Sequence, residues 1–475
     1  MSVAVGLDVG TSGVKALAIS ATGEVLASAE VGYGLSTPRP GWAEQDPADW
    51  WRATEEALDA VGVDEVAGIG LSGQMHGLVA LDAAAEVIRP AILWNDQRTA
   101  AQCREIEERV GFERLVELTG NRALTGFTAP KLLWLREHEP ESYARIARIM
   151  LPKDYVRLQL CGEHAIDVAD ASGTLLFDVA RRRWSDEVLD ALEIPREWLP
   201  RALESAEVSG TTPDGVPVAA GAGDQAAGAL GVGVTEPGPA SVVLGTSGVV
   251  FSALESYAAD PQARVHVFCH AVPGRWHAMG VMLSAAGSLQ WFRDTLAPGV
   301  EFGALLEEAA GWEPGAEGLT FLPYLAGERT PHADPDARGA FTGLSLRHDR
   351  GALARAVLEG VAFGLRDCLD VVRSVGAAPE VGRASGGGAR SELWLKIVAS
   401  ALELPVERVA VEEGAAYGAA MLGGIAGGLW RDADEAAEAC VRPHGRVDPE
   451  PGWVAAYGER REHFRALYPA LRDIP

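Results

Sequence analysis

Short apolar runs separated by turn residues open the chain. Residues 3–7, 14–19 and 25–29 are mostly apolar, and the turn segments between them, 8–13 and 22–23, include glycine, aspartate, serine and threonine. Stretches of this composition are typical of turns, and short apolar runs bounded by turns predict strands. We therefore expect the chain to begin with a β-meander whose three strands are joined by hairpins.

Further along the chain, short apolar runs alternate with segments of helical periodicity. Residues 66–71 and 79–81 predict strands, whereas residues 47–61 and 99–110 have the repeat of helices. Alternating strands and helices predict an α/β architecture. An amphipathic pattern at residues 453–471 predicts a last helix, and the sequence does not indicate which part of the fold it packs against.

One motif occurs twice. Gly-Thr-Ser-Gly-Val, residues 10–14, recurs at residues 245–249, about half a chain length later, and each copy lies between two predicted strands. Coincidence is the alternative in a chain with 55 glycines, but the matching context favours a duplication. A duplication predicts two similar α/β lobes with a cleft between them. Because residues 212–215 are turn-rich and lie near the midpoint, we expect domains of residues 1–216 and 217–475.

The chain is strongly acidic. It has 41 lysine and arginine residues against 67 aspartate and glutamate residues, and its net charge is −26. A field of that sign repels nucleic acid and anionic membranes, so we expect neither as a partner. An anionic substrate would have to be held by local donors, such as backbone N–H groups or a metal ion. Hydrophobic residues make up 48% of the 475 residues, as in ordinary globular proteins.

Cysteine usage and the chain start indicate the compartment. Five widely spaced cysteines without a CxxC pair argue against a disulfide framework and favour a reducing cytoplasm; we assign them no role. The N-terminus lacks the basic region of a signal peptide, and the longest uncharged stretch, residues 237–254, is broken by two prolines, so we expect no membrane span. His266 and His270 lie on a predicted strand about 13 Å apart, which argues against a shared metal ion.

Each Gly-Thr-Ser-Gly turn is a candidate phosphate site. Small residues let a ligand approach the backbone, and successive N–H groups and hydroxyls can then bind phosphate oxygens. Neither copy matches the P-loop pattern GxxxxGK[ST] or the dinucleotide pattern GxGxxG, which argues against a Rossmann-type dehydrogenase. Each copy alone is also compatible with a plain hairpin turn, whereas two copies facing each other would form a clamp on one polyphosphate.

Asp8 ends the first predicted strand, directly before the first turn. A carboxylate beside a phosphate site is repulsive unless a cation lies between them. Asp8 therefore either caps the turn or helps to hold Mg²⁺ through water, since Mg²⁺ keeps several waters and takes one or two carboxylates plus phosphates. Lys15, just beyond the turn, is either a local positive charge for the phosphates or a solvated strand residue.

Asp224 stands between a predicted strand at residues 217–220 and an alanine-rich segment of helical character. One interpretation is a helix N-cap, a common role of aspartate. The other is a general base at the mouth of the cleft, where neighbouring glycines would let a substrate come close. A positioned base raises a reaction rate by about 10²–10⁴. The residues of this segment alone leave both interpretations open.

Three further loops carry candidate chemistry. Gln74 and His76 follow a predicted strand, and either they hydrogen-bond a hydroxyl-rich ligand or they belong to an ordinary loop. Residues 94–98 form a similar polar cluster after an apolar run. Residues 386–388, three glycines before a predicted helix, either bind an anionic or planar ligand or form a flexible connector.

These motifs, in this order, resemble those of one enzyme family, the FGGY carbohydrate kinases. The Asp-x-Gly-Thr-Ser turn, the Gly-Ala-Gly-Asp segment, the second Gly-Thr-Ser-Gly turn and the Gly-Gly-Gly-Ala-Arg loop all occur in it. Residues 126–135 are similar to its first signature, and residues 339–344 with 353–359 to its second. The chain is most similar to the members that phosphorylate D-xylulose, in residues 42–47, 73–77, 91–96, 151–155 and 325–332. The resemblance extends from residue 3 to near residue 465.

The resemblance implies a two-lobed, actin-like fold of the ribonuclease H-like type, with ATP and a sugar in the cleft. It implies phosphoryl transfer from Mg-ATP to the 5-hydroxyl of D-xylulose, with Asp224 as the catalytic base and Asp8 as the other functional carboxylate. The residues expected to contact the sugar are Met75, His76, Gln74, Asp224 and Gln225. The residues expected to line the nucleotide are Gly10, Thr11, Ser12, Gly13, Lys15, Gly245, Thr246, Gly387 and Gly388.

Two positions depart from the family pattern. Gln225 stands where the relatives usually have asparagine, and its longer side chain is expected to narrow or reshape the sugar pocket. Ala352 replaces a polar residue at a predicted helix start, where we expect a structural effect alone. Gln225 keeps ribulose, L-xylulose and glycerol open as substrates. A non-kinase actin-like ATPase scaffold is a further alternative, although no polymer-forming or peptide-binding region is evident. We thus expect a sugar and ATP as partners, and a homodimer is left open.

Overall fold

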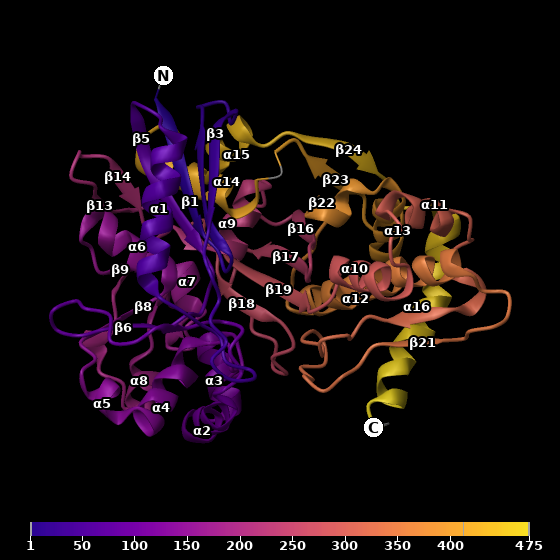
Figure 1. The fold of residues 1–475 in the computed structure, drawn as a ribbon, viewed down its shortest axis with the longest axis horizontal. Coiled ribbons are helices and arrows are strands. Elements are labelled where there is room, and N and C mark those ends of the chain that lie inside the picture. The colour runs from indigo at the N-terminus through magenta and orange to yellow at the C-terminus, as the bar shows by residue number, and fades with distance from the viewer. Residues whose placement is uncertain (1, 412, 474–475) are drawn as a thin grey trace.

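The computed structural model describes residues 2–411 and 413–473, which form two lobes, each built on a seven-stranded sheet (Figure 1). The first sheet contains β13 (Val208–Thr211), β14 (Pro217–Ala219), β5 (Val66–Gly73), β1 (Val3–Val9), β2 (Gly13–Ile19) and β3 (Val25–Gly32), with β15 (Ala222–Gly223) beside β5. The second sheet contains β18 (His266–Cys269), β19 (Trp276–Met282), β17 (Gly248–Leu254), β16 (Pro239–Leu244), β22 (Val381–Ser385), β23 (Val406–Val409) and β24 (Pro443–Val447).

The two sheets share one topology. β1 pairs antiparallel with β2 and parallel with β5, and β2 pairs antiparallel with β3. In the second sheet, β16 pairs antiparallel with β17 and parallel with β22, and β17 pairs antiparallel with β19. Each Gly-Thr-Ser-Gly motif forms the turn between the first two strands of its sheet. The predicted α/β class, the initial β-meander and the two similar lobes are therefore confirmed.

Helices surround both sheets. The first, α1 (Pro47–Val61), has its predicted bounds; Asp46 caps its start by accepting a hydrogen bond from the Ala48 N–H at 3.0 Å, and Gly62 ends it in a left-handed conformation. The other α-helices are α2 (Ala100–Val110), α3 (Phe112–Thr119), α4 (Thr128–His138), α5 (Pro140–Ala144), α6 (Pro152–Cys161), α7 (Val168–Ser172), α8 (Asp186–Leu192), α9 (Asp224–Gly231), α10 (Ala286–Leu296), α11 (Phe302–Ala310), α12 (Arg350–Ser374), α13 (Glu392–Leu402), α14 (Gly414–Ala426), α15 (Ala433–Cys440) and α16 (Pro451–Leu471).

Short strand pairs complete the fold. They are β4 (Glu44–Gln45) with β7 (Ala91–Ile92), β6 (Val79–Leu81) with β8 (Arg148–Met150), β9 (Ala165–Asp167) with β12 (Arg201–Leu203), β10 (Phe177–Asp178) with β11 (Arg183–Trp184), and β20 (Thr320–Leu322) with β21 (Ala340–Thr342). The 3₁₀ turns are η1 (Arg196–Trp198), η2 (Ala316–Gly318) and η3 (Gly387–Arg390). Among the described helices, none is long and apolar enough to cross a membrane.

α14 belongs to the second half of the chain but packs on the first sheet, against β1 and β5. It lies this close because glycines face it. A Cβ atom added to Gly70 on β5 would lie 1.8 Å from the carbonyl oxygen of Ala419. A Cβ atom added to Gly418 would lie 1.8 Å from the carbonyl oxygen of Ala227 in α9. The chain thus crosses back from the second lobe to complete the core of the first.

The chain passes from the first sheet to the second between β15 and β16. β14 and β15 follow the boundary expected at residue 216, yet both belong to the first sheet. The domains of residues 1–216 and 217–475 therefore remain a prediction, distinct from this division of the sheets. The last helix, α16, packs on the second lobe against α13 and β20 and buries Tyr457, Phe464 and Leu467.

Replacing Gly70 with alanine is expected to destabilise the fold by about 1–3 kcal/mol or more, because the added methyl group would overlap the backbone of α14. Thermal unfolding would show the effect as a lower Tm. The matched control is Gly458→Ala in α16, where an added Cβ meets no atom within 4 Å and alanine is favoured by roughly 0.5–1 kcal/mol. A Gly70 variant as stable as the parent would contradict this packing.

Candidate active site

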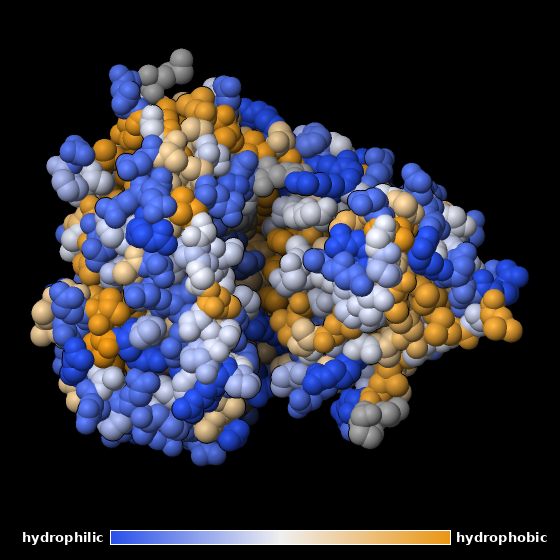
Figure 2. Space-filling model, viewed as in Figure 1, coloured by the Kyte–Doolittle hydropathy of each residue, from blue (hydrophilic) through white to orange (hydrophobic). Residues whose placement is uncertain are grey.

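A cleft separates the two lobes, and Figure 2 shows it as a deep groove across the middle of the molecule. Three hollows lie along it. The inner cavity, of about 200 Å³, is lined by residues that include Met75, His76, Trp94, Phe127, Asp224, Gln225 and Arg329. The carboxylate hollow, of about 330 Å³, is lined by residues that include Asp8, Asp224, Gln225 and Gly386. The glycine pocket, of about 670 Å³, is lined by residues that include Gly245, Thr246, Gly387 and Gly388.

The three hollows follow one another along the cleft. Asp224 and Gln225 line both the inner cavity and the carboxylate hollow. Gly386 lines the carboxylate hollow, and the next two residues, Gly387 and Gly388, line the glycine pocket. A ligand in the inner cavity would therefore contact Asp224 at the end of the cavity that leads to the glycine pocket.

Asp224 is the first residue of α9, and the N-cap position belongs to Gly223, which has no side chain. The N-cap interpretation of Asp224 is therefore wrong. Its Oδ1 accepts a hydrogen bond from Gln225 Nε2 at 3.3 Å. Burial and the negative charge of Asp8 raise the pKa of Asp224 to about 7, a value that suits a general base at neutral pH.

Asp8 lies near the end of β1, opposite Lys15 on β2. Burial raises the pKa of its carboxyl group to about 6, although the Ser72 hydroxyl and the Lys15 ammonium act in the opposite direction. Its Oδ1 is buried and has no hydrogen-bond partner in the described part of the chain. A buried carboxylate oxygen normally has a donor, and a cation would also satisfy it. This geometry favours the cation interpretation of Asp8 over turn capping.

Side chains hold the first turn by its carbonyl groups. Tyr33 Oη donates to Gly10 O at 2.6 Å, and Gln74 Nε2 donates to the same oxygen at 3.2 Å. Gln45 Nε2 donates to Thr11 O at 2.7 Å. Within the described residues, the N–H groups of Thr11 and its successor make no hydrogen bond. The turn therefore keeps two donors at its tip, as a phosphate site requires.

The second turn and the glycine loop lie together in the glycine pocket. N–H groups at the start of α10 donate to the carbonyl oxygens of Gly245 and Thr246. The loop forms the 3₁₀ turn Gly387–Arg390 rather than a flexible connector. Gly388 lies so close to Leu244 that an added Cβ would be 2.9 Å from its side chain. The pocket also has apolar walls that suit a planar base, formed by Leu289, Phe302 and Leu306.

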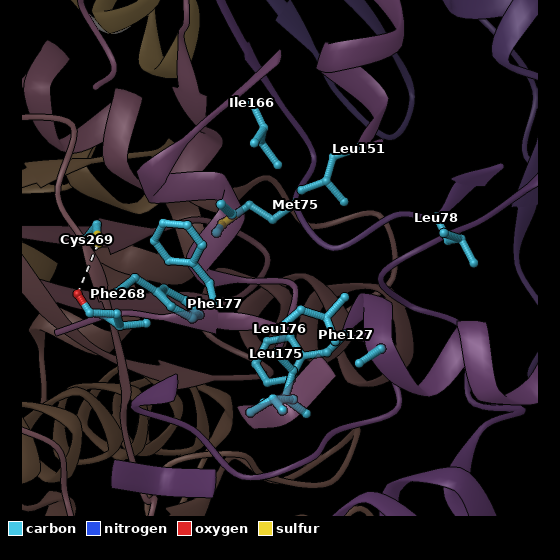
Figure 3. Packing of buried hydrophobic residues seen from close by; sticks show 14 of the residues in the cluster. Met75, Leu78, Phe127, Leu151, Ile166, Leu175, Leu176, Phe177, Phe268 and Cys269 are labelled. Atoms are coloured by element: carbon cyan, nitrogen blue, oxygen red, sulfur yellow. Dashed lines mark hydrogen bonds between the residues drawn. The ribbon is translucent and has the colours of Figure 1, made fainter. Parts of the chain in front are cut away.

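Met75 and His76 follow β5 and line the inner cavity. Figure 3 shows Met75 among buried apolar side chains of several elements, including Phe127 and Phe177. His76 Nδ1 lies 2.6 Å from the carbonyl oxygen of Gly173 and must donate to it. Burial lowers the pKa of His76 to about 3, so the ring is neutral at neutral pH. Its Nε2 is then a hydrogen-bond acceptor.

Lys131 supports the backbone of this wall. Its Nζ donates to the carbonyl oxygens of His76, at 2.8 Å, and of Gly126, at 2.5 Å. The Thr128 hydroxyl also donates to His76 O, at 3.0 Å. His76 has a φ of 70°, which is uncommon for a residue other than glycine, and these bonds stabilise it. Burial lowers the pKa of Lys131 to about 7.

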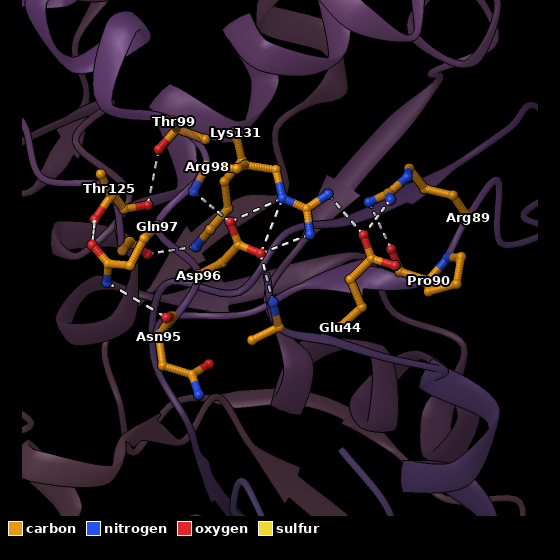
Figure 4. Close-up of polar contacts among 12 residues, drawn as sticks. Glu44, Arg89, Pro90, Asn95, Asp96, Gln97, Arg98, Thr99, Thr125 and Lys131 are labelled. Atoms are coloured by element: carbon orange, nitrogen blue, oxygen red, sulfur yellow. Dashed lines mark hydrogen bonds and ion pairs between the residues drawn. The ribbon is translucent and has the colours of Figure 1, made fainter. Parts of the chain in front are cut away.

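The polar cluster after β7 is mainly structural. Figure 4 shows Asp96 and Arg98 in one network with Glu44. Arg98 pairs with Asp96 at 2.6 Å and with Glu44 at 2.8 Å, and all three side chains are at most 10% exposed. Trp94 alone lines the inner cavity, and its Nε1 donates to the Thr11 hydroxyl of the first turn at 3.0 Å. The network thus fixes the loop that places this indole.

Some expected site residues line none of the three hollows. These are Gln74, Lys15 and the residues of the first turn. Gln74 is 2% exposed and bonds the first turn. Lys15 forms an ion pair with Glu413, directly before α14, so it is not simply a solvated residue. Conversely, reasoning from the sequence did not single out Phe127 or Arg329, although both lie in segments that carry the family resemblance.

The chain belongs to the FGGY family of carbohydrate kinases, since the models of the family's N-terminal and C-terminal domains match residues 3–231 and 240–427. It is therefore a carbohydrate kinase of the two-lobed, actin-like fold. The chain is 44% identical to a xylulose kinase of Escherichia coli strain K12, with 99% of both chains covered.

Solved structures agree with this assignment. A xyloylose kinase from Brucella ovis superposes with a TM-score of 0.94 at 42% identity and covers 100% of both chains. A gluconate kinase from Lactobacillus acidophilus superposes with a TM-score of 0.93 at 26% identity, covering 99% of this chain and 98% of that one. Because kinases named for different substrates share the fold so closely, the fold alone does not determine the substrate.

Proposed function

We propose that the chain transfers the γ-phosphoryl group of ATP to the 5-hydroxyl of D-xylulose, giving D-xylulose 5-phosphate and ADP. The observation that carries the proposal is the position of Asp224, which lines the inner cavity on one side and the carboxylate hollow on the other. The choice of sugar is supported by the xylulose kinases of Escherichia coli and Brucella ovis, at 44% and 42% identity over the whole chain.

The mechanism follows from the order of the hollows. The sugar occupies the inner cavity, where His76 Nε2 accepts a hydrogen bond from one of its hydroxyls. The nucleotide base occupies the glycine pocket, and the two Gly-Thr-Ser turns offer N–H groups to the phosphates. Asp224 accepts the proton of the attacking 5-hydroxyl group. As it does so, the hydroxyl oxygen of the sugar bonds to the γ-phosphorus, and the bond between that phosphorus and the ADP oxygen breaks. Catalysis of such transfers rests mostly on positioning and electrostatics, and closure of the lobes would exclude water.

The carboxylate hollow fits a nucleotide-bound magnesium ion. In the described residues, no three histidine, cysteine, aspartate or glutamate side chains form a metal site of their own. Mg²⁺ bound with a nucleotide needs only one or two carboxylates, because waters and phosphate oxygens complete its shell. Asp8, with its unpartnered Oδ1, would hold the ion through water. When bound there, Mg²⁺ neutralises part of the phosphate charge.

Activity is expected to fall below about pH 7. The pKa of Asp224 is raised to about 7, so at lower pH its carboxyl is protonated and cannot accept the hydroxyl proton. We expect kcat/KM for the sugar to fall by about tenfold per pH unit below that value. Steady-state rates at saturating Mg-ATP and constant ionic strength measure this.

Unfolding would not produce the same profile. A buried carboxyl with a raised pKa favours the folded state at low pH, and its contribution is lost as the pH rises through the folded pKa. The contribution of Asp224 to stability therefore changes in the opposite direction to the activity. A kcat/KM that stays constant from about pH 8 to 5.5 would contradict the role of Asp224.

The substrate is tested by sugar-dependent ADP release. The panel contains D-xylulose, L-xylulose, D-ribulose, L-ribulose, glycerol and gluconate, each with Mg-ATP. We expect kcat/KM for D-xylulose to exceed the others by at least about tenfold. Another preferred sugar would overturn the substrate but not the class of enzyme, and would turn attention to Gln225, which lines the inner cavity and bonds the base. A scaffold ATPase would release ADP without any dependence on the sugar.

A further inference from the structure

Arg329 places a positive charge in the wall of the inner cavity, and within the described residues no carboxylate forms an ion pair with it, although the charge of the adjacent Glu328 acts on it. In the described part of the chain, its guanidinium makes no hydrogen bond or ion pair, although the side chain lines the cavity. Its neighbour Arg264, by contrast, pairs with Asp260 at 2.9 Å. The side chain is partly buried, and a charge that is partly removed from water without a hydrogen bond is costly, so a partner that comes with the substrate would account for this arginine.

The backbone on both sides of Arg329 is held firmly. Glu328 Oε1 accepts hydrogen bonds from the N–H groups of Leu283, at 3.1 Å, and of Arg329, at 2.7 Å. The Thr330 N–H donates to Val281 O at 2.9 Å, and the Val281 N–H donates to the Thr330 hydroxyl at 3.0 Å. The guanidinium therefore extends from a fixed segment against the end of β19, as a preorganised binding residue should.

The cavity has two distinct ends. At one end, Asp224 and Gln225 also line the carboxylate hollow. At the other end, Arg329 and Leu124 also line an outer groove of about 580 Å³ between the lobes. Arg329 and His76 both line the cavity. They lie close enough that the charge of Arg329 adds to the effect of burial in lowering the pKa of His76. A ligand that reaches Asp224 with one end therefore presents its opposite end to Arg329.

We propose that Arg329 is a substrate-binding residue that donates hydrogen bonds to the C1–C2 end of a ketopentose and selects for the carbonyl group at C2. This inference rests on the proposed function, in which the 5-hydroxyl lies at Asp224. The carbonyl and the C5 hydroxyl are at opposite ends of D-xylulose, as Arg329 and Asp224 are in the cavity. Arginine has donors and no acceptor, which matches a ketone oxygen, an acceptor without a proton. The neutral His76 accepts from a hydroxyl on the same wall.

The test measures sugar binding as well as turnover. Arg329→Met and Arg329→Lys are compared with Arg104→Met, a matched control that removes an exposed arginine of the outer groove which does not line the inner cavity. Calorimetric titration without nucleotide gives Kd for D-xylulose and for xylitol, in which a hydroxyl replaces the carbonyl. Steady-state assays give KM for the sugar and for ATP, and Tm values report whether each variant is folded.

A hydrogen bond to a charged group is worth about 1.5–3 kcal/mol, or roughly 10–150-fold in affinity. We expect Arg329→Met to raise Kd and KM for D-xylulose by that factor, to reduce the preference for D-xylulose over xylitol, and to leave KM for ATP within about twofold. Arg329→Lys keeps the charge with fewer donors and should lie in between. Arg104→Met should bind like the parent.

Two results would overturn the proposal. One is a folded Arg329→Met variant with the parent's affinity for D-xylulose. The other is an equal loss of affinity for D-xylulose and xylitol, which would show that Arg329 does not distinguish a carbonyl from a hydroxyl. Failure of the proposed function is seen separately, because the parent enzyme would then not phosphorylate D-xylulose at all.

Discussion

Replacing Asp224 with asparagine is expected to lower kcat by at least about 100-fold, and up to about 10⁴-fold, the range for loss of a positioned base. Asparagine has nearly the same shape and can still bond Gln225, but its amide does not accept a proton. The pKa of the native carboxyl, raised to about 7 by burial and by Asp8, makes it an effective acceptor at neutral pH. The variant therefore removes the proton transfer and little else.

The Asp224→Asn variant should still bind nucleotide. Asp224 does not line the glycine pocket, so the Kd for ADP, measured by calorimetry, is expected to stay within a few-fold of the parent. Asp214→Asn, in an exposed turn, is the control for a charge change elsewhere and should have the parent's kcat. A turnover of Asp224→Asn close to that of the parent would contradict its role as the base, whereas loss of ADP binding would show a wider structural effect.

Replacing Lys153 with methionine is expected to have the largest effect on stability, about 3–5 kcal/mol. Lys153 is fully buried and pairs with Asp154 and Asp167 at 2.7 Å and with Asp170 at 2.9 Å. Without its ammonium, these carboxylates would lose the cation that lies between them. Arg157, which pairs with Asp154 at 2.7 Å, would be the one cation left beside them among the pairs described.

Chemical denaturation of the two proteins measures this difference in the free energy of unfolding. Burial raises the pKa of Asp167 and of Asp170. The loss in free energy of unfolding caused by the substitution should therefore be smaller at low pH, where both carboxyl groups are protonated, and larger as the pH rises. Lys396→Met is the control, because Lys396 forms a half-exposed pair with Glu450 at 3.2 Å, and such pairs contribute about 0–1 kcal/mol. A Lys153 variant within about 1 kcal/mol of the parent would contradict the importance of the cluster.

This cluster also supports the active site. Asp167 caps α7 by accepting from the Asp170 N–H at 2.9 Å, and α7 leads directly to Gly173, whose carbonyl oxygen binds His76. On the other side, Gly73 at the end of β5 packs against Lys153. A Cβ atom added to Gly73 would lie 3.2 Å from the Cβ atom of Lys153. Loss of the cluster is therefore expected to disturb the His76 wall of the inner cavity as well as the global fold.

Much of the fold followed from local patterns. The runs at residues 3–7, 14–19 and 25–29 correspond to β1, β2 and β3, and the helix expected at residues 47–61 has these bounds. Strand and helix periodicity, turn residues and caps act over a few neighbouring residues, so the sequence expresses them directly. The repeated Gly-Thr-Ser-Gly motif revealed the duplication for the same reason, because each lobe uses it for the same hairpin.

The chemistry of the site depended on contacts between distant residues. Asp224 was compatible with a helix cap or a base until the structure placed Gly223 at the cap and Asp8 nearby. Gln74 is a plausible sugar ligand from its neighbours in sequence, yet its bonds go to the first turn. Lys15 meets Glu413, nearly 400 residues later. Such pairings are decided by how the lobes pack, which no local pattern contains.

The sequence by itself determined the α/β class, the two lobes and the family, because these rest on local propensity and on motifs of fixed spacing. Only the tertiary structure decided which side chains lie together in the site and in what surroundings. The return of α14 to the first sheet buries residues from both halves together, and burial and neighbouring charge set the pKa of Asp224 and Asp8. The position of Arg329 in the inner cavity, where its guanidinium has no hydrogen bond or ion pair within the described residues, likewise depends on the packing of distant segments and could not be predicted from its neighbours in sequence.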